Sequence, residues 1–101
     1  MQLQQQQTPI TCIRVSERLD AWEVRGEWEG GYGRDITDIS KQRVPAPYER
    51  ACALAVEWCQ TAGLRHYLVE RFTRRVPYEF RLDTIEIKTG TVIDSQIVNY
   101  G

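Results

Sequence analysis

The feature that most constrains the fold is a strict alternation of side chains between positions 22 and 29. Apolar or small residues occupy positions 22, 24, 26 and 28, and charged residues occupy positions 23, 25, 27 and 29. Successive side chains of a β-strand point to opposite faces of the sheet, so this period of two predicts a strand with one buried and one solvated face. We expect it to form a hairpin with the β-branched run at 10–16.

A single segment, Pro47–Ala62, has the period of a helix. Pro47 suits the first helical turn, Glu49 suits the positive end of the helix dipole, and Gly63 suits a left-handed C-terminal cap. The centre of its apolar face consists mostly of small residues, namely Tyr48, Ala51, Cys52, Ala55, Cys59 and Ala62. Because small side chains let a helix approach closely, we expect this face to pack on a sheet.

Three more strands are predicted after the helix, at 67–74, 78–87 and 91–98. Phe80 and Ile85 fall on opposite parities, which predicts a bulge or a strand break near Asp83. Residues 30–46 contain three glycines, a proline and no sustained period, so we expect a long loop there. The sequence therefore predicts an α+β fold in ββαβββ order, a single antiparallel sheet covered on one face by one helix.

The length of 101 residues suits one hydrophobic core. With 42% hydrophobic and 27% charged residues, the composition is that of an ordinary globular domain. Residues 1–8 are rich in glutamine and lack an apolar period, which predicts a disordered tail. We expect residues 9–101 to form a single α+β domain.

The residues that most often carry catalysis or bind metals are few and widely spaced. Zinc sites usually take cysteines in close pairs, and that spacing is missing among Cys12, Cys52, Cys59 and His66. No nucleophile motif organises the serines. We therefore predict a non-enzymatic protein without metal or cofactor. No signal peptide or apolar run of membrane-spanning length is found, so we expect a cytoplasmic location and no membrane partner.

The strongest functional signal lies between Arg65 and Arg81, where five arginines are interspersed with four aromatic residues. Five arginines against Glu70 and Glu79 give this stretch a local charge of +3, although the whole chain carries −1. Arginine and tyrosine are favoured at the centres of protein interfaces. We predict a small adaptor or regulatory protein that binds an acidic patch on a protein partner through Arg71, Arg74, Arg75, Arg81 and Tyr78, with Tyr32 of the glycine-rich loop as a further anchor.

Three alternatives remain open at this point, apart from an enzyme, which would need a pocket around His66 or the loop at 30–33. RNA or single-stranded DNA is the second candidate partner, with bases stacking on Tyr67, Phe72, Tyr78 and Phe80, although the pI of about 5.8 is low for such a protein. The arginines could instead be neutralised by the acidic stretch at 17–29 on a neighbouring strand. Finally, the last strand suits pairing with a second copy at the sheet edge, giving a homodimer.

Overall fold

The computed structural model describes residues 9–28 and 34–101. The predicted tail at 1–8 and the predicted anchor Tyr32 lie outside these residues. The elements follow in the order β1 (Ile10–Glu17), β2 (Ala21–Trp28), β3 (Arg34–Ser40), α1 (Pro47–Ala62), β4 (His66–Phe72), β5 (Glu79–Glu86) and β6 (Val92–Asn99).

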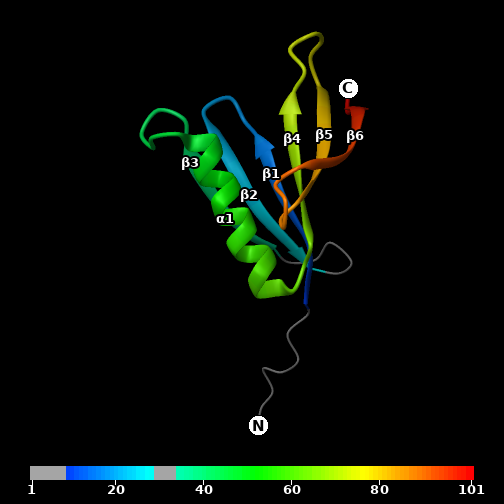
Figure 1. Cartoon of the computed structure of the whole chain (residues 1–101). Helices are drawn as coiled ribbons and strands as arrows, with labels where there is room; N and C mark the ends of the chain where they lie inside the picture. Colours follow the sequence, from blue (N-terminus) through cyan, green and yellow to red (C-terminus); the bar gives the residue numbers. More distant parts are fainter. Residues whose placement is uncertain (1–8, 29–33) are drawn as a thin grey trace.

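The six strands form one sheet in the order β3-β2-β1-β4-β5-β6 (Figure 1). Neighbouring strands are antiparallel except at the centre, where β1 and β4 run parallel from Arg14 and Leu68 to Ser16 and Glu70. The fold is α+β as predicted, but the prediction of a single antiparallel sheet is wrong. Parallel neighbours need a crossover connection, and here β2, β3 and α1 lie between β1 and β4 in the chain.

The predicted element order is also wrong, because β3 lies inside the segment expected to be a loop. This strand pairs antiparallel with β2, from Ala21 and Ser40 to Glu27 and Arg34. Its two isoleucines, Ile36 and Ile39, have opposite parity and therefore point to opposite faces. An edge strand with one isoleucine on each face has no apolar period, which explains why its pattern resembles that of a loop.

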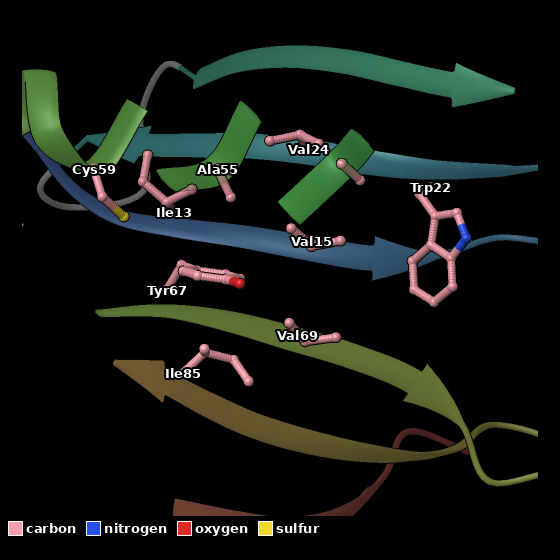
Figure 2. Packing of buried hydrophobic residues seen from close by; sticks show 10 residues of the cluster. Ile13, Val15, Trp22, Val24, Ala55, Cys59, Tyr67, Val69 and Ile85 are labelled. Carbon is pink, nitrogen blue, oxygen red and sulfur yellow. The ribbon is translucent and has the colours of Figure 1, made fainter. Parts of the chain in front are cut away.

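Helix α1 packs on β2, β1, β3 and β4, as the small residues on its apolar face predict (Figure 1). Ala51, Ala55 and Cys59 are fully buried. Figure 2 shows Ala55 and Cys59 lying over Ile13 of β1. The predicted cap at Gly63 is confirmed, since its φ is 74° and its N–H reaches the carbonyls of the last turn.

The sheet therefore has a covered face, on which α1 packs, and an opposite face. Strand register places Val15, Val24 and Val69 on the covered face and Arg14 on the opposite face. On β5, Ile85 belongs to the covered face, where it joins the core beside Tyr67. Phe80 has the other parity, so it lies on the opposite face. The predicted bulge or break in this strand is wrong, because β5 pairs with β4 without a shift from Phe80 to Glu86 and its side chains alternate throughout. A shift does occur in the pairing of β5 with β6, where Thr84 pairs with Asp94 and Ile85 with Val92, so the extra residue lies in β6.

Candidate functional site

A cleft of about 900 Å³ lies at the end of the sheet where the β1–β2 turn and the β4–β5 loop protrude. Both connections point to the same end of the molecule in Figure 1. We call this feature the hairpin cleft. It is lined by Glu17, Arg18, Leu19, Lys41, Phe72, Arg74, Arg75, Val76, Pro77, Tyr78 and Phe80.

Apolar side chains on both connections of the hairpin cleft are unusually exposed. Leu19, at the tip of the β1–β2 turn, is 89% exposed, and Val76 and Tyr78 of the β4–β5 loop are also exposed. The rings of Phe72 and Phe80, at the adjoining strand ends, lie 5.2 Å apart between centroids. Contiguous exposed apolar residues framed by charge are typical of interaction sites.

Glu17 links the two protruding connections at the cleft. Its carboxylate is 4% exposed and accepts hydrogen bonds from Lys41 Nζ at 3.0 Å, Arg74 Nη2 at 2.8 Å and the main-chain N–H of Phe72 at 3.0 Å. Burial disfavours its charge, but the bonds from Arg74, Lys41 and Phe72 outweigh that effect and hold the pKa of Glu17 below its usual value. A buried anion thus holds two cations in place at the cleft.

Glu79 fixes the second loop arginine in a similar way. Arg75 donates from Nε to Oε1 at 3.0 Å and from Nη2 to Oε2 at 2.8 Å, while the Thr73 hydroxyl donates to Oε1 at 2.6 Å. The bonds from Thr73 and Arg75 lower the pKa of the Glu79 carboxyl. Arg74 and Arg75 nevertheless keep 68% and 72% of their side chains exposed. Because a guanidinium has five N–H donors, each retains donors for a ligand.

The β4–β5 loop is also strained. Arg74 and Tyr78 have φ values of 66° and 64°, in the left-handed region that side chains disfavour. A main-chain hydrogen bond from the N–H of Thr73 to the carbonyl of Glu79 closes the loop. A second, from the N–H of Tyr100 to the carbonyl of Tyr78, ties the loop to the segment after β6. Left-handed residues other than glycine persist where the surroundings impose them, and they concentrate at binding sites.

The structure brings only some of the predicted site residues together. Arg74, Arg75 and Tyr78 line the hairpin cleft. Arg71 and Arg81 are cross-strand partners on the covered face. There the Arg71 guanidinium lies 4.3 Å from the centre of the Tyr48 ring, and Arg81 Nε donates to Asp83 at 3.1 Å.

The cleft also contains residues that the sequence analysis missed. Arg18, Leu19 and Lys41 come from segments outside the arginine-rich stretch. Leu19 had a usable signal, because it is a single large apolar residue in an otherwise polar turn between two strands. Lys41 had none, because its place at the cleft depends on β3, which the sequence did not reveal.

Part of the arginine signal is explained by ion pairs within the fold. Arg74 with Glu17 and Arg14 with Glu70 join the two halves of the sheet, at 2.8 and 3.4 Å. Pairs within the β4–β5 hairpin join Arg75 to Glu79 and Arg81 to Asp83. The net positive charge available to a partner is therefore smaller than the sequence suggests.

The aromatic residues considered for base stacking are divided between the two faces. Tyr67 is buried on the covered face. Phe80 lies on the opposite face, where its ring centroid is 5.2 Å from that of Phe72 and 5.4 Å from that of Tyr100. On β1, β2 and β4 that face carries more carboxylates than guanidiniums, with Glu23, Glu27 and Glu70 against Arg14 and Arg25. That balance disfavours a phosphate backbone.

Among residues 9–28 and 34–101, no cluster of three or more histidine, cysteine or acidic side chains could hold a metal ion. Burial raises the pKa of the Cys59 thiol to about 11, and its Sγ donates to the carbonyl of His66. A protonated thiol is a poor nucleophile. No helix in the described part of the chain has the length and hydrophobicity to cross a membrane.

Comparison of the chain with protein-family models, with curated proteins and with solved structures finds no match.

Proposed function

We propose that this is a small non-enzymatic interaction protein whose hairpin cleft binds a short acidic segment of a protein partner, with an apolar side chain of that segment as anchor. The observation that carries the proposal is the composition of the cleft. Four cations, Arg18, Lys41, Arg74 and Arg75, surround exposed apolar side chains. Their ion-pair partners are three carboxylates, Glu17 in the lining with Glu23 and Glu79 beside it, so the positive charge remains in excess. An acidic and apolar ligand complements both properties.

The arrangement also favours binding through preorganisation. Glu17 holds Arg74, and Glu79 holds Arg75 in a two-point contact, so neither long side chain must be ordered when a ligand arrives. Lost side-chain freedom is one of the main costs of association. Exposed Tyr78 adds a large, stiff contact surface of the kind found at interface centres.

The test is affinity purification from the native host with the unaltered chain and with Leu19→Ser and Tyr78→Ser variants. Ile36→Ser is the control, since it removes an exposed apolar side chain on β3, away from the cleft. We expect a protein bound by the unaltered chain and the control but lost from both cleft variants. Equal capture by all four chains would contradict the proposal.

RNA or single-stranded DNA remains the alternative ligand, supported by the Phe72, Phe80 and Tyr100 rings on the opposite face. Nuclease treatment of the same purification separates the two. A protein bound directly survives the treatment, whereas capture through nucleic acid is lost. A salt titration adds a second criterion, because affinity for phosphates falls linearly with the logarithm of salt concentration.

A further inference from the structure

Strand β6 forms one edge of the sheet and exposes apolar side chains. Val92, Ile93 and Ile97 are all exposed, and β6 lies beyond the strands on which α1 mainly packs (Figure 1). Edge strands offer unpaired main-chain groups, and natural proteins usually protect them with charges, proline or a covering element. β6 has eight residues, no proline and one charge, at Asp94.

The opposite edge of the sheet is protected in the usual way. Strand β3 carries Arg34, Asp35 and Asp38 within seven residues, and α1 packs on it. Like charges placed against a copy of the same strand would oppose pairing. The two edges therefore differ in their capacity to accept another strand.

The sequence of β6 matches itself when it is reversed. Reading outwards from Ser95, the strand has Asp94 and Gln96, then Ile93 and Ile97, then Val92 and Val98. In a two-fold symmetric dimer, residue i of one copy contacts residue j of the other, and j contacts i. Antiparallel pairing about Ser95 would therefore bring Ile97 to Ile93 and place each aspartate opposite a glutamine amide that can donate to it. The match ends before the valines, because the shift in the β5–β6 pairing puts Val92 across from Ile85 on the covered face, whereas Val98 lies across from Phe80 on the opposite face.

The main-chain groups suit the same arrangement. The N–H of Tyr100 donates to Tyr78, and Phe80 with Val98 continues that register, so the even-numbered residues of β6 from Asp94 onward bond to β5. In an antiparallel strand the alternate residues bond to the other side. Ser95 and Ile97 therefore direct their N–H and C=O groups to the outer edge.

We propose that two copies of this chain associate through β6, antiparallel about a two-fold axis at Ser95, to form a continuous sheet with both helices on the same side. The side chains of Asp94 and Gln96 select the axis at Ser95, and the outward main-chain groups of Ser95 are compatible with it. This inference does not depend on the function proposed for the hairpin cleft. We expect a dissociation constant between about 1 μM and 1 mM, because one pair of strands makes a small interface.

The mass in solution tests the dimer, measured by sedimentation across that concentration range. The unaltered chain should shift from 11.8 kDa to twice that mass. Ile97→Glu should keep it monomeric, whereas Ile36→Glu should leave it dimeric. The variants are matched, since Ile97 and Ile36 are 55% and 50% exposed and each pairs with an arginine, Arg81 and Arg25. A monomer at about 1 mM, a dimer that survives Ile97→Glu, or one lost in Ile36→Glu overturns the proposal.

A charge pair at Gln96 tests the register itself. Gln96 is exposed and faces Leu82 within its own chain, so substitutions there leave the fold intact. Gln96→Glu would place two like-charged pairs with Asp94 across the dimer and should weaken association roughly tenfold, whereas Gln96→Lys would place two opposite pairs and should strengthen it. Equal effects of the two variants would overturn the axis at Ser95.

Discussion

Arg74 donates from Nη2 to Oε2 of Glu17 over 2.8 Å, although the two residues are 57 positions apart in the chain. The contact joins the end of β1 to the β4–β5 loop and holds one side of the hairpin cleft against the other. It also neutralises one of the arginines that dominate the sequence. One ion pair therefore contributes both to the fold and to the shape of the candidate site.

Glu17→Gln should lower the free energy of unfolding at about pH 7 by about 2 kcal/mol, because hydrogen bonds between buried charged groups are replaced by weaker ones. The folded pKa of Glu17 is depressed, so its contribution is present above the unfolded pKa of about 4.3 and is lost as pH falls through the folded value. Urea unfolding at several pH values measures the effect.

The control for this prediction is Glu27→Gln, which alters a carboxylate that is 26% exposed, against 4% for Glu17, and that pairs with Arg25 at 2.9 Å. Ion pairs near the surface contribute little to stability, so we expect Glu27→Gln to change the free energy of unfolding by less than about 1 kcal/mol, both at neutral pH and towards pH 3. The difference between the unaltered chain and Glu17→Gln should shrink from neutral pH towards pH 3. A difference that is the same at both values would show that the charge of Glu17 does not stabilise the fold.

Ala55 tests the close approach of α1 to the sheet. It is fully buried between the helix and the strands, so Ala55→Leu should overpack the core and lower stability by about 2 kcal/mol. Ala53 lies on the exposed side of the same helix, and Ala53→Leu should change stability by less than about 0.5 kcal/mol. Thermal or urea unfolding of the two variants makes the comparison, and equal effects would contradict the packing.

The helix was predictable from the sequence because several local signals agree. Pro47 and Gly63 mark its ends, and the spacing of its small apolar residues identifies the face that packs on the sheet. The pairing of β1 with β4 was not predictable, because it depends on where the chain returns after α1 and not on any local pattern. Strand β3 was missed because it lies at the sheet edge and has one isoleucine on each face. Its sequence therefore lacks the alternation of apolar and polar residues that marks a half-buried strand.

Ala46 offers a test of backbone strain at the start of the helix. Its φ is 45°, and its side chain makes no capping bond. Ala46→Gly should raise stability by about 1 kcal/mol, because glycine adopts the left-handed region without the steric cost of a Cβ atom. The same change at Ala53, inside the helix, should lower stability by about 1 kcal/mol. Changes of the same sign at both positions would contradict the assigned conformation of Ala46.

The candidate site was only partly predictable, because strand direction and pairing decide which residues share a surface. The arginine-rich stretch indicated Arg74, Arg75 and Tyr78 as binding residues, and the structure brings these three together at the cleft, since they occupy one loop. Arg71 and Arg81 are only a few residues away, but strand direction places them on the covered face. The reverse symmetry of β6 was visible in the sequence, yet it acquires meaning only when the strand is known to be an edge.

Tyr78 combines backbone strain with an exposed ring, so substitutions can separate its role in stability from its role in binding. Its φ is 64°, and its main-chain carbonyl, which accepts from Tyr100, is unaffected by a change of side chain. Tyr78→Ala keeps the strain and removes the ring, whereas Tyr78→Gly removes both. We expect Tyr78→Gly to be more stable than Tyr78→Ala by about 1 kcal/mol. Both should lose the captured partner, because the ring is absent in each. If Tyr78→Gly binds as well as the unaltered chain, the ring is not an anchor; if the two variants are equally stable, the loop does not hold this residue in a strained conformation.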